Sequence, residues 1–223
     1  MRLLATKILD LPFKTRILAL GYRLVEYSFI EKTAINYPTK AWSENWIFSS
    51  AYAAKIALEH SKIGAALKEK RLFCVGKKTA AVFLAQSLDV VQIAPNAKAL
   101  TEKIRATEPP TAFSFFCGKK RRPEIETHLT TAGFSIDIHE LYTTTLNPKS
   151  FRSSFDGALF FSPSAVESFV QSNSIETLHA FCIGPTTATA VAKYSHNYSI
   201  AQNPDEGSLL VQLKKYSATH AEK

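Results

Sequence analysis

Two pairs of matching segments decide the fold. Trp46-Ile-Phe-Ser-Ser-Ala-Tyr-Ala53 corresponds to Ala158-Leu-Phe-Phe-Ser-Pro-Ser-Ala165, and Phe73-Cys-Val-Gly-Lys-Lys-Thr-Ala80 corresponds to Phe181-Cys-Ile-Gly-Pro-Thr-Thr-Ala188. Each segment is a short apolar run followed by small and polar residues, which is typical of a buried strand that leads into a helix. The copies are about half the chain apart, whereas solenoid repeats recur every 20–50 residues or so. The repeat therefore predicts two similar domains.

Apolar runs elsewhere extend the same alternation. We expect buried strands at Leu3–Ala5, Trp46–Phe48, Leu72–Val75, Val90–Ala94, Ala112–Cys117, Ala158–Phe161 and Phe181–Ile183. We expect helices at Ala51–Glu59, Thr79–Ser87, Ala97–Thr107, Pro123–Ala132, Ser164–Gln171 and Thr187–Tyr194. Strands that alternate with helices at this spacing predict parallel sheets with right-handed crossovers. The fold class is therefore α/β.

Two segments have a different pattern and suggest how the domains are joined. Arg23–Lys32 and Ser135–Thr144 alternate apolar and polar residues, as strands with one solvated face do. They bracket the first repeat copy, so we interpret residues 23–37 and 135–144 as connecting strands. The expected domains are then an inserted α/β domain at 38–134 and a discontinuous α/β domain made of 1–32 and 145–223.

The charge balance favours a polyanionic partner. The 223 residues include 27 Lys and Arg against 19 Asp and Glu, which gives a net charge of +8. Such a surface suits nucleic acid, an acidic membrane face or a polyanionic small molecule. No apolar run approaches the roughly 20 residues that span a bilayer. The start Met1–Lys7 is basic and apolar, but Lys7, Asp10 and Lys14 interrupt the apolar stretch. It is therefore expected to be a first strand followed by a helix rather than a targeting segment.

Residue patterns for metal, nucleotide and covalent chemistry are absent from the sequence. The six histidines show no HExxH spacing, and no Walker A loop, GxGxxG fingerprint or GxSxG elbow occurs. Cys74, Cys117 and Cys182 form no CxxC pair and lie inside apolar strands, where thiols are usually inert. We therefore expect no cofactor and no metal, and a reducing, cytoplasmic compartment.

The repeated elements are candidates for anion binding. Ser50 and Ser162 each stand between a strand and a helix, and Gly76 and Gly184 follow strands with a threonine three residues on. Such helix starts leave backbone N–H groups pointing outward, where the helix dipole favours anions. Ligands of open α/β sheets bind at the carboxyl ends of the strands. Capping alone explains any single element, but the set of four favours an anion-binding cleft between the domains.

Two further features are ambiguous on sequence grounds alone. Gly118-Lys-Lys-Arg-Arg122 follows a strand and could clasp carboxylates or phosphates, although a run of charge is commonly just a solvated face. Tyr142 ends a connecting strand, where its phenol could act as a neutral proton donor. The alternative for Tyr142 is an aromatic side chain packed at a domain hinge.

Five motifs along the chain, taken in order, resemble those of the uroporphyrinogen-III synthase family. The motifs are Phe48-Ser-Ser with Ala53, Val75-Gly-Lys-Lys-Thr-Ala80, Leu141-Tyr142-Thr, Phe161-Ser-Pro-Ser-Ala-Val166 and Ile183-Gly-Pro-Thr-Thr-Ala188. The resemblance covers essentially the whole chain. The sequence departs from the family pattern at Lys7, where an Arg is usual, at Ser49 in place of Thr, and at Thr143 in place of Arg.

The resemblance implies two flavodoxin-like domains joined by a two-stranded ladder, and a cofactor-free lyase of tetrapyrrole synthesis. Its substrate would be hydroxymethylbilane, a linear polycarboxylate, which is cyclised to uroporphyrinogen III with inversion of the last ring. Tyr142 would assist departure of the hydroxyl. The implied substrate-binding residues are Ser49, Ser50, Gly76, Thr79, Gly118, Arg121, Ser162, Ser164, Gly184, Thr186, Thr187 and Lys7.

The sequence leaves two other classes of function open. A non-catalytic two-domain sensor for a polyanionic small molecule would show the same pattern of residues. A nucleic-acid binder would explain the charge, but aromatic residues are not interleaved with Lys119–Arg122, which disfavours stacking readout. We therefore expect no nucleic-acid or membrane partner. We expect a monomer that makes at most a transient contact with the preceding enzyme of the pathway.

Overall fold

The computed structural model describes residues 1–37 and 41–220, and the chain divides into two compact units. Unit 1 contains residues 1–31 together with the chain from Thr145 onward, and unit 2 contains Lys32–Thr144. Unit 2 is therefore inserted into the sequence of unit 1. Each unit is an α/β layer structure built on its own sheet.

Unit 1 contains a five-stranded sheet in the order β2-β1-β9-β10-β11. The strands are β1 (Arg2–Ala5), β2 (Arg23–Glu26), β9 (Gly157–Phe160), β10 (His179–Cys182) and β11 (Tyr198–Ile200). Every neighbouring pair is parallel. Numbered along the chain within the unit, this is the 2-1-3-4-5 order of flavodoxin-like sheets.

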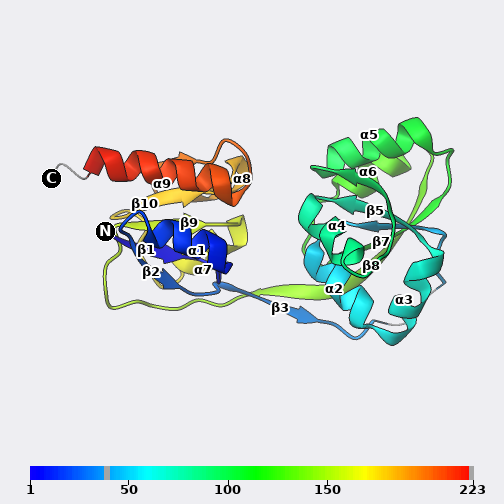
Figure 1. The fold of residues 1–223 in the computed structure, drawn as a ribbon, viewed down its shortest axis with the longest axis horizontal. Helices are drawn as coiled ribbons and strands as arrows, with labels where there is room; N and C mark the ends of the chain where they lie inside the picture. The colour runs from blue at the N-terminus through cyan, green and yellow to red at the C-terminus, as the bar shows by residue number, and fades with distance from the viewer. Residues whose placement is uncertain (38–40, 221–223) are drawn as a thin grey trace. The chain divides into compact units, whose positions relative to one another are not determined.

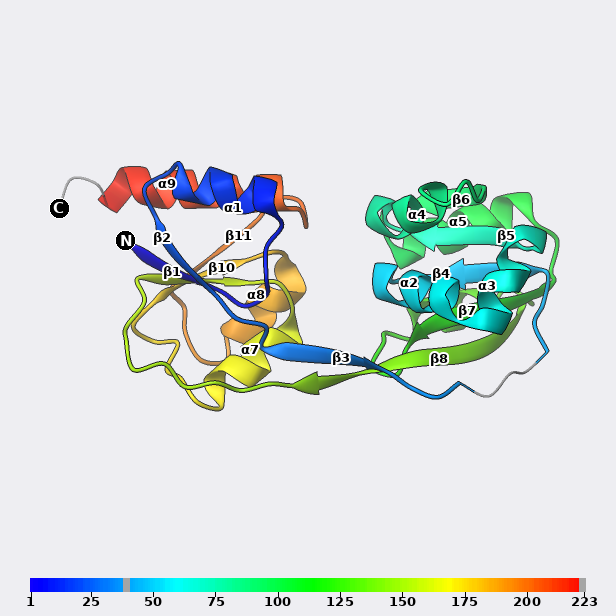
Figure 2. The same ribbon diagram turned by 60° about the horizontal axis from the view of Figure 1, so that its bottom comes forward.

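Helices cover both faces of the unit 1 sheet (Figures 1 and 2). They are α1 (Leu11–Leu18) and α9 (Glu206–His220) on one face, and α7 (Pro163–Val170) and α8 (Pro185–Val191) on the other. Consecutive strand residues alternate between the two cores, so Leu3 packs with α1 and α9 while Leu4 packs with α7 and α8. This double burial explains why the strands are apolar throughout.

Unit 2 contains a six-stranded sheet in the order β3-β8-β7-β4-β5-β6. The strands are β3 (Ile30–Ala34), β4 (Asn45–Phe48), β5 (Arg71–Val75), β6 (Val90–Ala94), β7 (Ala112–Gly118) and β8 (Ser135–Leu146). Five of them, β8-β7-β4-β5-β6, form a parallel sheet, and numbered along the chain their order is 5-4-1-2-3. The sheet matches that of unit 1 position by position when β4, β5 and β6 are set against β9, β10 and β11. The repeat seen in the sequence is the correspondence of β4 with β9 and of β5 with β10.

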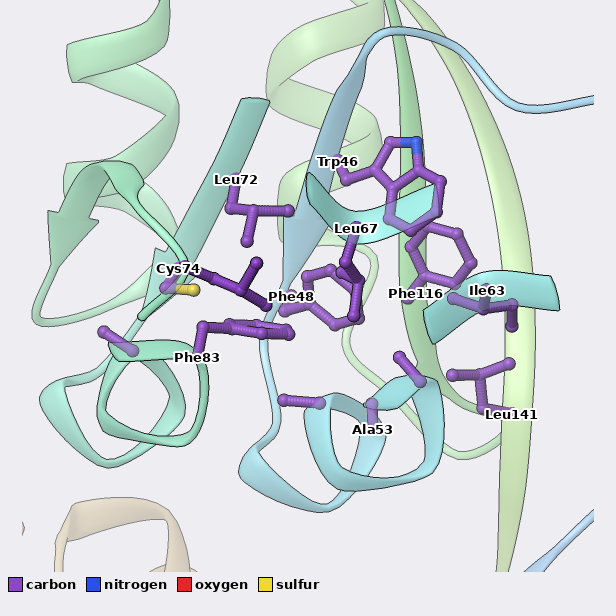
Figure 3. Packing of buried hydrophobic residues seen from close by; sticks show 14 of the residues in the cluster. Trp46, Phe48, Ala53, Ile63, Leu67, Leu72, Cys74, Phe83, Phe116 and Leu141 are labelled. Atoms are coloured by element: carbon purple, nitrogen blue, oxygen red, sulfur yellow. The ribbon is translucent and has the colours of Figure 1, made fainter. Parts of the chain in front are cut away.

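Helices also cover both faces of the unit 2 sheet. One face carries α2 (Ala51–Glu59), α3 (Ser61–Ala66), the short 3₁₀ turn η1 (Leu67–Glu69) and α4 (Lys77–Leu84), and the other carries α5 (Ala97–Thr107) and α6 (Glu124–Thr130). Beneath α2, the ring of Phe116 lies 4.6 Å from that of Trp46 and stacks at 5.0 Å on Phe48 (Figure 3). Each such buried aromatic contributes about 1.5–3 kcal/mol of transfer free energy, and these rings belong to the same buried cluster as Tyr142.

The α/β class and the two-domain parallel-sheet architecture are confirmed. The expected strands and helices are present, with ends shifted by a few residues. The connecting segments differ from expectation. Arg23–Lys32 is two strands, because β2 pairs in parallel with β1 before the chain bends at Tyr27–Phe29 and enters β3. Residues 38–40 of the expected inserted domain lie outside the described residues.

The second expected connection, residues 135–144, is also largely a sheet strand. Its residues from Ser135 to Glu140 pair in parallel with β7, and only the end of β8 pairs with β3. That last pairing is antiparallel, because the Ile35 N–H donates to the Leu141 oxygen and the Asn147 N–H donates to the Phe29 oxygen. Neither α3 nor β11 is predicted from the sequence, because six and three residues are too short to show a period.

Candidate active site

A bulge in β8 determines where the Tyr142 side chain lies. Cys117 of β7 pairs with Glu140, but the next residue, Gly118, pairs with Tyr142, so that Leu141 is an extra residue in β8. In a regular strand successive side chains alternate faces, whereas a bulge turns one of them. Leu141 and Tyr142 consequently belong to the same buried cluster on the α2 side of the sheet.

Gly118 makes room for the tyrosine. A Cβ atom at Gly118 would lie 2.6 Å from Cζ and 2.9 Å from Oη of Tyr142. The two strands are held together here by a 2.8 Å hydrogen bond from the Lys119 N–H to the backbone carbonyl oxygen of Tyr142. No side chain fits at that spacing. The structure therefore gives Gly118 a steric role toward Tyr142, in addition to its place in the wall of the cavity described below.

The phenol of Tyr142 is hydrogen-bonded to the start of α2. Its O–H donates to Ser50 Oγ over 3.1 Å, and the same oxygen caps α2 by accepting from the N–H groups of Tyr52 and Ala53. The ring of Tyr52 meets the Tyr142 ring edge-on with centroids 5.0 Å apart. Burial raises the pKa of Tyr142, and the bond to Ser50 offsets this only in part, so the phenol is neutral at physiological pH.

A cation lies over both rings. The Lys32 ammonium is 5.5 Å from the centroid of the Tyr142 ring and 5.6 Å from that of Tyr52, and the Tyr52 O–H donates to the Lys32 oxygen over 2.9 Å. Much of the Lys32 side chain is exposed, but its charged end is enclosed by the rings, and this desolvation lowers its pKa. The arrangement places a positive charge on the ring face of Tyr142.

These residues border a cavity of about 400 Å³ at the carboxyl ends of the unit 2 strands. The cavity lies within unit 2 and combines hydroxyls, cations and apolar walls. It is lined by Ser49, Ser50, Val75, Pro95, Asn96, Ala97, Phe115, Gly118, Lys120, Arg121, Arg122, Glu124, Ile125 and Tyr142. The structure therefore brings together Ser49, Ser50, Gly118, Arg121 and Tyr142 of the predicted site, at the strand ends where α/β ligands bind.

Arg121 is already paired with carboxylates of the protein. Its Nε donates to Glu126 over 2.6 Å and its Nη1 donates to Glu140 over 2.9 Å. Burial opposes the charge, but these bonds outweigh it and raise the pKa of Arg121. We expected Arg121 to bind the ligand's acid groups directly. Its guanidinium instead ties α6 to β8 across the cavity wall. Lys120 and Arg122 also line the cavity, and Arg122 lies 3.7 Å from the Glu124 carboxylate.

The glycines and threonines of the repeat differ from expectation in part. Gly76 has φ +84°, which favours glycine at the start of α4, but Gly184 is extended and its Cβ would meet nothing closer than 3.8 Å. Both threonines are buried, and the N–H groups of Thr79 and Thr187 donate to the oxygens of Gly76 and Gly184 over 3.1 Å each. These two N–H groups are therefore used within their own helix starts, and anion binding by the other N–H groups there stays a prediction.

The remaining predicted residues lie in unit 1, at the carboxyl ends of β1, β9 and β10. Ser162 caps α7 by accepting from the Ala165 N–H over 3.2 Å, and Ser164 and Thr186 lie in the first turns of α7 and α8. Lys7 forms a 2.9 Å ion pair with Glu206 and lies 4.3 Å from the centroid of the Phe161 ring. These side chains share one sheet edge, and none of them lines the unit 2 cavity.

The cysteines do not supply a nucleophile. Burial raises the pKa of Cys74, Cys117 and Cys182 to about 12, so all three thiols stay protonated. Among residues 1–37 and 41–220, no three His, Cys, Asp or Glu side chains gather as a metal site would require. In the same part of the chain, no helix is long and apolar enough to cross a membrane.

Comparison with known proteins identifies the family. The family model described as uroporphyrinogen-III synthase HemD matches residues 12–211. The chain belongs to the uroporphyrinogen-III synthase family. It is thus an enzyme of tetrapyrrole and haem biosynthesis, which cyclises hydroxymethylbilane to uroporphyrinogen III with loss of water and inversion of the last pyrrole ring. The resemblance drawn from the sequence motifs is confirmed.

Solved structures share the fold. The uroporphyrinogen-III synthetase of Helicobacter pylori 26695 matches with a TM-score of 0.74 at 16% identity, covering 97% of this chain and 100% of that one. A mutant uroporphyrinogen III synthase from the extremely thermophilic bacterium Thermus thermophilus matches with a TM-score of 0.66 at 14% identity, covering 98% and 99%. At sequence identities this low, the matches show a shared fold and nothing more. A search of curated proteins finds no match.

Lys32 and Tyr52 were not predicted as site residues. Tyr52 carries a weak signal, since it lies two residues after the cap Ser50 on the first turn of α2. Lys32 carries none, because its position depends on the pairing of β3 with β8, which brings residues 110 positions apart together. Only the folded structure shows that its ammonium covers the tyrosine rings.

Proposed function

We propose that the unit 2 cavity receives the reacting end of hydroxymethylbilane, and that Tyr142 assists the departure of its hydroxyl. The observation that carries the proposal is the buried Tyr142–Ser50 hydrogen bond at the wall of a cavity that also contains Lys120 and Arg122. A neutral hydroxyl donor beside cations suits a substrate that must lose a hydroxyl group while its carboxylates are held.

The acid arms of the substrate are the proposed ligands of the other residues. In unit 2, Ser49 and Ser50 offer hydroxyls and Lys120 and Arg122 offer charge at the cavity. Gly76 and Thr79 stand at the start of α4, after the neighbouring strand, and are proposed as further contacts. In unit 1, the proposed contacts are Lys7, Ser162, Ser164, Gly184, Thr186 and Thr187. Arg121 contributes by fixing the cavity wall. The two units serve as the two domains of the enzyme, and the net charge of +8 suits a polycarboxylate ligand.

The chemistry needs orientation more than activation. Loss of the hydroxyl gives an azafulvene cation, which the far pyrrole ring attacks through its substituted carbon; the resulting spiro-pyrrolenine fragments and recloses with the ring inverted. Without the enzyme the bilane closes to the uninverted isomer. The protein therefore gains most by holding the reacting carbons in one geometry, an effect worth up to about 7–11 kcal/mol in favourable cases.

The proposal extends to the surroundings of the enzyme. We place it in the cytoplasm as a monomer, and we expect at most a transient contact with the enzyme that supplies the bilane, because the linear substrate cyclises by itself. No nucleic-acid partner is proposed, and neither metal nor nucleotide is required.

Incubation with hydroxymethylbilane tests the function. The purified, chelator-treated protein is expected to yield uroporphyrinogen III as the main isomer with no added metal or nucleotide, measured by chromatographic separation of the isomers. A folded protein that binds the substrate but yields only the uninverted isomer would be the non-catalytic sensor, and the proposal would fail.

A further inference from the structure

The hydrogen bonds of Ser50 account for its lone pairs but not for its hydrogen. Ser50 Oγ accepts from the Tyr52 and Ala53 N–H groups at 3.3 and 3.5 Å, two long bonds that share one region of the oxygen, and from the Tyr142 O–H at 3.1 Å. A hydroxyl has two lone pairs and one hydrogen. Within the described residues the Ser50 hydrogen has no acceptor, and Ser50 lines the cavity.

The direction of the Tyr142–Ser50 bond follows from acidity and from the cap. A phenol is a much stronger acid than an aliphatic alcohol, so it is the better donor, while the alkyl oxygen is the better acceptor. The helix start adds to this preference, because the cap requires Ser50 Oγ to present its lone pairs to α2. The Tyr142 O–H is therefore directed at Ser50 Oγ.

From this geometry we infer that Ser50 is the residue that donates to the departing hydroxyl, and that Tyr142 acts through it as a positioning and polarising residue. The inference rests on the proposed function, since it assigns an atom within the same site. It differs in its prediction for Ser50, which becomes a catalytic residue in place of a ligand for an acid arm.

The proton transfers balance without a co-reactant. As the C–O bond breaks, its electron pair leaves with the oxygen, the Ser50 proton moves to that oxygen to complete a water molecule, and the Tyr142 proton moves to Ser50 Oγ. The substrate becomes the azafulvene cation. Ring closure later releases one proton from a pyrrole carbon, and this proton restores Tyr142. The net products are water and the cyclised tetrapyrrole.

Burial raises the pKa of Tyr142 and so opposes a negative charge on its oxygen, and the positive charges around the phenol act against that penalty. The Lys32 ammonium of β3 lies over its ring at 5.5 Å, and the amino end of α2 lies on its oxygen side. The other titratable groups facing it are the thiol of Cys117 on β7, which burial keeps protonated, and the phenol of Tyr52 on α2. Positive charge therefore meets the phenol from two sides, and no carboxylate is among the groups that act on it in the described residues.

A double-mutant cycle tests the relay. We expect Tyr142→Phe and Ser50→Ala each to lower kcat by about 10²-fold or more, with much smaller changes in KM. We expect the double variant to be no slower than the slower single variant, because both changes interrupt one chain of hydrogen bonds. The solvent isotope effect on kcat is expected to be larger in the wild type, where two O–H bonds change, than in Tyr142→Phe.

Variants at Ser50 separate donation from capping. Ser50→Thr retains the hydroxyl and the cap and should keep kcat within about threefold. Ser50→Asp should cap α2 and accept from Tyr142, so its melting temperature should be preserved, but it has no proton to donate and should be as slow as Ser50→Ala. Asp10→Ala removes the cap of α1, where Asp10 accepts from the Phe13 N–H over 3.0 Å, and should lower stability with unchanged kcat.

The outcomes separate the inference from the proposed function. A wild type that makes no uroporphyrinogen III would overturn the function itself. Fast Ser50→Asp or Ser50→Ala together with slow Tyr142→Phe would show that Tyr142 donates directly, and the relay would be wrong. Losses that multiply in the double variant would also overturn it, since independent contributions add in free energy.

Discussion

Gly118 and Tyr142 form a fitted pair, since a Cβ on the glycine would lie 2.6 Å from the tyrosine ring. The pair exists because the bulge at Leu141 brings the two residues opposite each other. A change at the glycine is therefore expected to act on the position of the tyrosine.

Gly118→Ala should displace the Tyr142 ring. We expect a loss of stability of about 1–3 kcal/mol from overpacking, and a fall in kcat of at least tenfold, because a displaced phenol cannot keep its bond to Ser50. Gly207→Ala in α9 is the matched control; its Cβ would meet only the end of the Asp205 side chain at 3.2 Å. Thermal unfolding and steady-state kinetics measure both. Full activity in a folded Gly118→Ala variant would show that the ring position is unimportant.

Tyr142→Phe retains the ring and removes only the phenol oxygen. Its contacts with Tyr52 and Gly118 persist, so the free energy of unfolding should fall by no more than about 1 kcal/mol, while turnover falls by roughly 10²–10⁴-fold. Tyr22→Phe gives the matched control, because the Tyr22 O–H donates to the Leu213 oxygen over 2.9 Å within the unit 1 core. That variant should lose similar stability and keep its turnover. Equal turnover in both variants would contradict the role of Tyr142.

Thr187→Val distinguishes substrate binding from chemistry. The side chain is buried at the first turn of α8, and the proposed function assigns it to an acid arm rather than to the leaving hydroxyl. We expect KM to rise more than kcat falls, which is the signature of lost ground-state binding. A fall in kcat with unchanged KM would place Thr187 in the chemical step.

Acid should weaken unit 2 through the Arg71–Glu108 pair. Two bonds of 2.7 and 2.8 Å join the guanidinium to the carboxylate, and they lower the pKa of Glu108. A lowered carboxyl pKa adds stability above the unfolded value of about 4.3, and this stability is lost as pH falls through the folded pKa. Glu108→Gln should therefore cost roughly 1–2 kcal/mol at pH 7 and progressively less as pH falls below about 4 toward and through the folded pKa. Chemical denaturation over a series of pH values from 7 downward measures this, and a cost that does not change with pH would exclude the ion pair as the cause.

Ser87 gives a prediction about the backbone alone. It is the non-glycine residue with positive φ among the described residues, at +56° after α4. The left-handed conformation costs an L-residue roughly 1–2 kcal/mol. Glycine avoids this steric cost, but it loses more backbone conformational entropy on folding, which costs about 0.5–1 kcal/mol. The expected order of melting temperature is Ser87→Gly at or above wild type, with Ser87→Val clearly below it. The reverse order would mean that this turn relaxes at no cost.

The core elements could be predicted because burial leaves a local record. Strands such as Ala112–Cys117 are covered on both faces and are apolar at almost every position, and the caps Ser50 and Ser162 stand at the residue where a helix begins. The family could be predicted from the order of these signals. Each of them depends on a few neighbouring residues, so the sequence carries it directly.

The site could be predicted only in part, because its geometry depends on pairing between distant residues. The bulge at Leu141 depends on the register between β7 and β8, and the engagement of Arg121 depends on Glu126 and Glu140 being near it in space. A run of cations shows that charge is present, but not which carboxylate holds it. Lys32 could not be predicted for the same reason, because its partners Tyr52 and Tyr142 lie on other elements.

The insertion of unit 2 within unit 1 has a consequence for synthesis on the ribosome. β1 pairs with β2 on one side and with β9 on the other. The second edge of β1 therefore stays unpaired until Gly157, the partner of Leu3, has been synthesised. At about 5–20 residues per second this delay is roughly 8–30 s. During that interval the contiguous unit 2 can fold, while the nascent β1–β2 segment exposes an apolar edge that chaperones and neighbouring chains can bind. Slow codons after Thr144 would prolong that exposure, so the yield of soluble enzyme should depend on translation speed in this stretch.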